Sequence, residues 1–163
     1  MTLLSDANVR AEHKLARLKN MQTAPLNCEI AEAPKAGTAY WIQTDVSVRL
    51  RVGLWPGRNA QKGTILVFPG RTEYIEKYGR TVTAFAESGF TTFVMDWRGQ
   101  GLADRIAKDP MLGHVVQFSD YRKDVAAMTA AAKDLDLPKP WHLVGHSLGA
   151  CIGVSDLAEC LPG

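Results

Sequence analysis

The residues most clearly suited to catalytic chemistry form a Gly-X-Ser-X-Gly pattern, Gly145-His146-Ser147-Leu148-Gly149. A short apolar run at 141–145 precedes this pattern, and a helix-forming run follows it. A sharp strand-to-helix turn lifts a serine hydroxyl out of the surrounding packing, which a serine needs before it can act as a nucleophile. Such a turn also leaves the backbone N–H of Leu148 at a helix N-terminus, facing the place where an oxyanion would form. The pattern therefore predicts Ser147 as a nucleophile and Leu148 as an oxyanion donor.

A glycine- and serine-containing loop before a helix can match this pattern by chance. The elements around it therefore decide between a nucleophile turn and an ordinary loop. Two continuous apolar runs, 64–68 and 90–95, are typical of strands buried on both faces. Helical periodicity follows each run, at 74–87 and at 118–135, and a last helix extends from the pattern to about residue 159. Alternating buried strands and helices predict an α/β fold with a mainly parallel sheet.

The N-terminal part of the chain has a different pattern. Residues 38–43 and 46–55 predict an antiparallel hairpin whose second strand alternates apolar and polar residues and is half exposed. Residues 5–21 predict a helix with an apolar stripe that packs on the domain; the alternative is an interfacial helix on anionic lipid. Residues 22–37 read as a linker. We therefore divide the chain into an N-terminal helix and linker (1–37) and an α/β region (38–163).

Composition narrows the class of protein. The 163 residues are 46% hydrophobic and 22% charged, and a net charge of +2 gives no support for nucleic-acid binding. The three cysteines lack disulfide or metal-ligand spacing, so we expect a reducing compartment, no metal and no cofactor. The sequence has no secretory signal and no apolar run of 18 residues, and we expect a cytoplasmic protein.

Four segments together resemble the α/β-hydrolase fold and, within it, the lysophospholipase and monoacylglycerol lipase group. They lie in the order and spacing of that group between residue 38 and about residue 160. These segments are Phe68-Pro69-Gly70-Arg71-Thr72-Glu73-Tyr74, Asp96-Trp97-Arg98-Gly99-Gln100-Gly101, the stretch 114–125 with His114, Asp120 and Asp124, and the nucleophile elbow at 145–149.

The resemblance implies roles for several of these residues. The backbone N–H of Arg71 would be the second oxyanion donor, as in the loop after the third strand of such enzymes. Arg71 and Glu73 would contact a polar head group; the alternative is that both are solvated loop charges. Asp96 would bond loop N–H groups and have no catalytic role. Asp120 would begin a helix, and Asp124 would lie on a solvated face.

The sequence after Ser147 does not contain the rest of a catalytic triad. In this fold the order along the chain is serine, acid, then histidine. Residues 148–163 contain Asp156 and Glu159, which we place on the helix after the elbow, and no histidine. We therefore expect the N-terminal half of a longer hydrolase, either truncated, frame-shifted or a fragment. In such a chain the strand at 141–145 would be an apolar sheet edge through which the chain could self-associate.

The resemblance implies a serine hydrolase of lysophospholipids, monoacylglycerols or similar carboxylic esters, acting through an acyl-enzyme on Ser147. The chain alone would then be inactive, because the acid and the histidine are absent from it. One alternative is a non-catalytic fragment, or a subunit that a partner completes. Another is that His114 serves as the base within this chain, although His114 and His146 match structural positions of the family.

Overall fold

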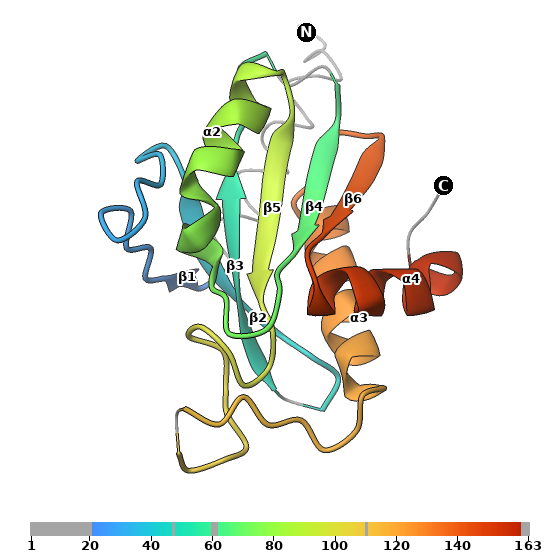
Figure 1. Cartoon of the computed structure of the whole chain (residues 1–163). Helices are drawn as coiled ribbons and strands as arrows, with labels where there is room; N and C mark the ends of the chain where they lie inside the picture. Colours follow the sequence, from blue (N-terminus) through green and yellow to red (C-terminus); the bar gives the residue numbers. More distant parts are fainter. Residues whose placement is uncertain (1–20, 47, 60–61, 110, 161–163) are drawn as a thin grey trace, which may run out of the picture.

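The computed structural model describes residues 21–160 except 47, 60–61 and 110. Its centre is a six-stranded sheet in the order β1-β2-β3-β5-β4-β6, shown in Figure 1. The strands are β1 (Thr23–Ala24), β2 (Thr38–Gln43), β3 (Arg49–Trp55), β4 (Thr64–Phe68), β5 (Thr91–Asp96) and β6 (Trp141–Gly145). The helices are a short 3-10 helix η1 (Ile75–Tyr78), α2 (Gly79–Glu87), α3 (Asp120–Asp134) and α4 (Leu148–Cys160). Apart from Met21, the helix predicted at 5–21 lies outside the described residues.

The sheet is mixed, with its parallel part where the elbow lies. Strand β4 pairs in parallel with β5 on one side and with β6 on the other. The pairs β1–β2, β2–β3 and β3–β5 are antiparallel. The predicted hairpin is confirmed as β2 and β3, and the predicted α/β alternation is confirmed from β4 onward. The short β2–β3 connection can join only antiparallel strands, whereas β4, β5 and β6 are joined by helix-containing crossovers that permit parallel pairing.

Helices cover both faces of the sheet. Figure 1 shows α2 over one face, where a core cluster includes Trp55, Val67, Ile75 and Val82. On the other face, α3 and the start of α4 bury a larger cluster that includes Leu66, Phe93, Met128 and Ile152. The apolar runs of β4 and β5 are completely buried, as expected for strands between two helical layers.

The prediction for the second hairpin strand is wrong in two respects. Strand β3 begins at Arg49 and not at residue 46, and residues 50–55 are all buried although the sequence alternates. The reason is that η1 and the segment at 25–27 cover the face that the alternation assigned to solvent. The linker prediction also missed β1, which pairs with β2.

Strand β6 ends the sheet within the described part of the chain, since β4 is its pairing partner and no further strand follows there. Its side chains are more exposed than those of β4, and Val144 is 39% exposed. None of the described helices combines the length and the hydropathy that a membrane crossing requires.

Candidate active site

The elbow and the two preceding loops meet at one edge of the sheet. Because β4, β5 and β6 run in parallel, their carboxyl ends lie together, and Phe68 of β4 is in register with Gly145 of β6. The loop after β4 and the long segment after β5 therefore start beside the turn that carries Ser147. In open α/β sheets this edge is where ligands bind.

Ser147 occupies the turn between β6 and α4 in a strained conformation. Its φ is +49°, in the left-handed region that non-glycine residues rarely adopt, and the residue is exposed. Such a conformation costs about 1–3 kcal/mol and persists where the surroundings enforce it. The His146 N–H donates to the Phe68 carbonyl at 3.0 Å, and the Gly149 N–H donates to the His146 carbonyl at 2.9 Å. The backbone of Leu148 begins α4, where helix N–H groups have no acceptor within the helix.

Both glycines of the elbow are required by close backbone contacts. A Cβ at Gly145 would lie 2.6 Å from the Ala150 Cα atom. A Cβ at Gly149 would lie 2.0 Å from the Phe68 carbonyl oxygen, which is backbone and cannot move independently. The spacing of the two glycines therefore follows from the way the first turn of α4 packs on the end of β4.

This contact predicts a difference between two glycines of the same helix. Gly149→Ala is expected to lower the free energy of unfolding by about 1–3 kcal/mol, because the added methyl group meets backbone. Gly153→Ala is the matched control: its Cβ would lie 2.6 Å from the Leu143 Cδ2 atom, the flexible end of a side chain. We expect it to be nearly neutral, since alanine also favours the helix. Urea unfolding of both variants measures this, and equal losses would contradict the packing described.

The loop after β4, residues 69–73, is called the oxyanion loop below. Arg71 is exposed at its tip, and its side chain borders a cavity of about 470 Å³ together with His114. Glu73 is only 5% exposed, so for this residue the alternative of a solvated loop charge is wrong. Its carboxylate accepts hydrogen bonds from the Gly70 N–H (2.6 Å), Lys77 Nζ (2.5 Å) and Tyr78 OH (2.6 Å). His146 Nδ1 of the elbow lies 3.0 Å from the same carboxylate.

These contacts change the acidity of Glu73. Burial by itself would raise the pKa of this carboxyl, but the hydrogen bonds from Lys77, Tyr78, Gly70 and His146 outweigh it and lower the pKa from 4.5 to about 2. The same carboxylate, together with burial, raises the pKa of Tyr78. Glu73 is thus ionised in the folded protein at every pH above about 3.

A pH dependence of stability follows from the lowered pKa of Glu73. Because its folded-state pKa lies below 4.5, its ionised form stabilises the fold above that pH, and the contribution is lost as the pH falls toward 2. The difference in unfolding free energy between the wild type and Glu73→Gln should therefore shrink between pH 5 and pH 3. Urea unfolding across this range measures it, with the exposed Glu87→Gln as control. A difference that stays constant with pH would contradict the assignment.

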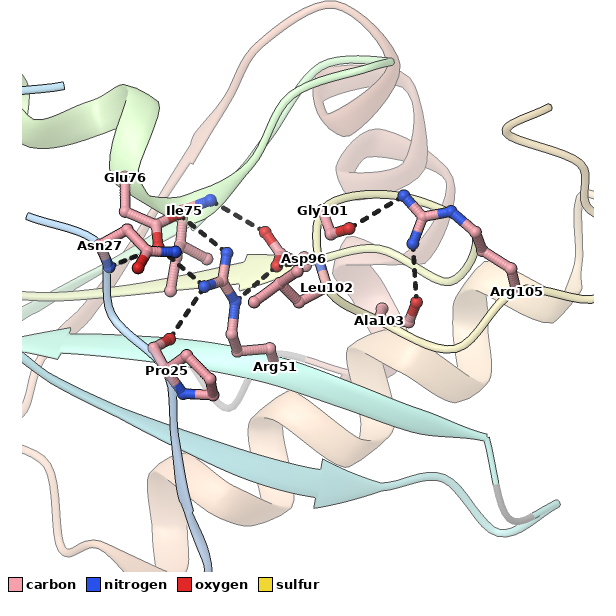
Figure 2. A network of polar contacts seen from close by, with 10 residues as sticks. All are labelled: Pro25, Asn27, Arg51, Ile75, Glu76, Asp96, Gly101, Leu102, Ala103 and Arg105. Carbon is pink, nitrogen blue, oxygen red and sulfur yellow. Dashed lines mark hydrogen bonds and ion pairs between the residues drawn. The ribbon is translucent and has the colours of Figure 1, made fainter. Parts of the chain in front are cut away.

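Behind the oxyanion loop lies a buried charge network, shown in Figure 2. Arg51 donates from Nε to Asp96 (2.7 Å) and from Nη1 and Nη2 to Glu76 (2.7 and 2.8 Å). Asp96 also accepts the N–H groups of Ile75 (2.9 Å) and Leu102 (2.9 Å), which confirms its predicted structural role. Burial raises the pKa of the Asp96 carboxyl, and Arg51 offsets part of this effect. The network joins β3, η1 and the turn after β5.

The structure corrects the prediction for Asp124. It was expected on a solvated face, yet it is completely buried and accepts hydrogen bonds from Arg98 Nε (2.9 Å) and Nη2 (2.7 Å). The reason is that Arg98, in the turn after β5, reaches the first turns of α3. Asp120 is the first residue of α3, as predicted, and Asp156 lies on α4, where it accepts a hydrogen bond from Arg122.

A second cavity, of about 370 Å³, opens beside the oxyanion loop. Apolar side chains form much of its lining, with Arg105, Gln100 and Glu73 among the polar groups. The apolar lining residues are Ile30, Tyr74, Leu102 and Met111. Among the described residues, no group of three His, Cys, Asp or Glu side chains could hold a metal ion.

Comparison with known proteins identifies the family. The family model described as serine aminopeptidase, S33, matches residues 59–161. Lysophospholipase L2 of Escherichia coli (strain K12) is 36% identical over 91 residues, which are 54% of this chain and 26% of that protein. Phospholipase YtpA of Bacillus subtilis (strain 168) is 30% identical over 90 residues, 55% of this chain and 32% of that protein. The chain thus spans about a quarter to a third of the length of these curated relatives.

Solved structures agree on the fold. An esterase of Pyrococcus furiosus, Pf2001, superimposes with a TM-score of 0.62 at 19% identity, over 85% of this chain and 53% of that one. A monoglyceride lipase of Saccharomyces cerevisiae gives a TM-score of 0.52 at 24% identity, over 71% of this chain and 37% of that one. Since the family model covers more than half of the sequence, this chain belongs to the serine aminopeptidase S33 family and is a lysophospholipase-like α/β hydrolase.

Proposed function

We propose that the chain carries the nucleophile half of a serine hydrolase site for carboxylic esters. Ser147 Oγ would attack the ester carbonyl, and the N–H groups of Leu148 and Arg71 would hold the oxyanion that forms. The observation that carries this proposal is the position of Ser147: exposed, at φ +49°, at the carboxyl end of β6 and beside the oxyanion loop. A structural serine has no need of this strained turn.

The reaction requires a base that accepts the Ser147 proton and returns it to the leaving alcohol. Water then attacks the acyl-enzyme and releases the carboxylic acid. No histidine follows Ser147 within residues 1–163. We propose that the triad acid and histidine lie outside this chain. The chain alone is then nearly inactive and keeps only the slow ester turnover that oxyanion donors provide without a base.

The proposed substrates are lysophospholipids and monoacylglycerols. The mainly apolar cavity of about 370 Å³ is bordered by Glu73 and Gln100 and not by Ser147, Leu148 or Arg71, so the proposed substrate class rests on the relatives. Two relatives are named lysophospholipase L2 and phospholipase YtpA, which supports a lipid ester. The exposed Arg71 would contact a polar head group. For Glu73 this contact has less support, because four groups of the chain already surround its carboxylate.

Substrate panels test this proposal against the peptidase chemistry that the family description includes. The purified chain is incubated with a 1-acyl lysophospholipid, a monoacylglycerol and an aminoacyl anilide, and product release is followed by mass spectrometry. We expect fatty acid release above the level of Ser147→Ala. Faster release from the anilide would favour an aminopeptidase and contradict the proposal.

A second candidate is a chain that acts only when a partner completes it. The exposed edge strand β6 favours this reading, because such an edge can pair with another strand. A folded sample that releases no fatty acid above Ser147→Ala and elutes as a dimer would support it. Size-exclusion chromatography with circular dichroism makes the distinction, since aggregation would point to a non-catalytic fragment.

A further inference from the structure

The backbone on both sides of Arg71 is fixed by hydrogen bonds to other parts of the chain. The Pro69 carbonyl accepts a hydrogen bond from Trp97 Nε1 at 2.8 Å. The Gly70 N–H donates to Glu73 at 2.6 Å, and the Thr72 N–H donates to Gln100 Oε1. Thr72 also has a φ of +64°, so the chain reverses sharply just after Arg71. The peptide groups adjacent to the Arg71 N–H are therefore anchored.

One of these anchors also reaches the nucleophile elbow. Glu73 lies 3.0 Å from Nδ1 of His146, the residue before Ser147. The oxyanion loop and the elbow are in direct contact at this point, since a Cβ on Gly70 would lie 2.8 Å from the same nitrogen. Glu73 thus touches both loops that would form the oxyanion hole.

The Glu73 side chain and the backbone of Gln100 are themselves held in place. Lys77 Nζ and Tyr78 OH, at the end of η1, both donate to the Glu73 carboxylate. Gln100 is 3% exposed and lies in the turn after β5, where its own N–H donates to the Trp97 carbonyl at 2.9 Å. Asp96 fixes the same turn through the Leu102 N–H.

From these contacts we infer that Glu73 and Gln100 are positioning residues that aim the backbone N–H of Arg71 at the site of the oxyanion. This inference rests on the proposed function, in which Arg71 supplies that donor. The two side chains act through the backbone and do not touch the substrate carbonyl. An oxyanion donor is effective only when it is held in place before the reaction, which is the property these anchors provide.

Hydrogen exchange and active-site labelling together test the inference. In Glu73→Gln, a single amide oxygen faces the donors that two carboxylate oxygens now satisfy, so we expect exchange of the Gly70 amide to rise about tenfold or more. Phosphonylation of Ser147 by a fluorophosphonate should slow about 10- to 100-fold, because a misplaced Arg71 N–H would stabilise the transition state less. Gln100→Met should show the same two effects at Thr72 and at Ser147.

The matched control is Glu32→Gln. Glu32 also pairs with a cation, Arg80, but the pair is exposed and does not touch the oxyanion loop. We expect neither exchange nor labelling to change. If Glu73→Gln fails to fold, Tyr78→Phe removes one donor to Glu73 and should give the same changes at about a third of their size.

The outcomes separate this inference from the proposed function. Unchanged exchange of the loop amides in folded Glu73→Gln and Gln100→Met would overturn the anchoring. Increased exchange with unchanged Ser147 labelling would overturn the positioning role. If exchange rises in the variants but Ser147 of the wild type is not labelled, the anchoring is supported and Ser147 is not a nucleophile.

Discussion

Replacing Arg51 by methionine is expected to lower the free energy of unfolding by about 3–5 kcal/mol. Arg51 is 1% exposed and is the cation between two buried carboxylates, Glu76 and Asp96. Removing it leaves both buried carboxylates without the cation that pairs with them. The loss is a large part of the 5–15 kcal/mol by which domains are stable, so the variant should lie close to unfolding.

The matched control lies two residues away on the same strand. Arg49 also pairs with an aspartate, Asp104, but both side chains are more than 40% exposed. It also lies over the Trp41 ring at 4.2 Å. We expect Arg49→Met to cost less than about 2 kcal/mol, since exposed ion pairs and cation–π contacts contribute little.

Urea unfolding of the two variants under the same conditions compares these costs. A loss for Arg51→Met no larger than that for Arg49→Met would show that the buried network does not support the sheet edge. A further variant, in which Arg51, Glu76 and Asp96 are all replaced by apolar residues of similar size, should recover part of the loss. The reason is that no unpaired buried charge is then left.

Reaction with a fluorophosphonate is expected to fall to background when Ser147 is replaced by alanine, a loss of at least about 100-fold. The two proposed backbone donors beside the exposed hydroxyl would distinguish Ser147 from other serines, and one such donor is worth about 10²–10³ in rate. The exposed Ser119, just before α3, lacks this setting, so Ser119→Ala should label like the wild type.

Peptide mass spectrometry of the labelled chain locates the adduct directly. We expect the phosphonyl group on the peptide that contains Ser147. Labelling that persists in Ser147→Ala, or an adduct on another serine, would contradict it.

The sequence was sufficient to predict the elements that are defined by apolar runs. Strands β4 and β6 have the predicted bounds, 64–68 and 141–145, and β5 differs by one residue at each end. Strands β4 and β5 are buried by helices that follow them in the sequence, so the local pattern already reflects the tertiary environment. The elbow was predictable for the same reason, because strand, turn and helix are consecutive.

The buried charges were not predictable in this way. Arg51 stands at a position that alternation assigns to solvent, but its partners Glu76 and Asp96 are 25 and 45 residues away. Glu73 has the appearance of a loop charge in the sequence, yet its carboxylate also lies 3.0 Å from His146, which follows it by 73 residues. The order of strands in the sheet decides which acidic side chains meet such distant partners. A single sequence does not reveal that order.

The central claim is that Ser147 is a fully formed nucleophile position whose base lies outside residues 1–163. The most direct test is the rate of Ser147 phosphonylation as a function of added imidazole, a soluble substitute for a catalytic histidine. We predict a slow rate without imidazole that rises with its concentration, equally in the wild type and in His114→Ala. A fast rate that ignores imidazole and is lost in His114→Ala would contradict the claim, because the chain would then contain its own base.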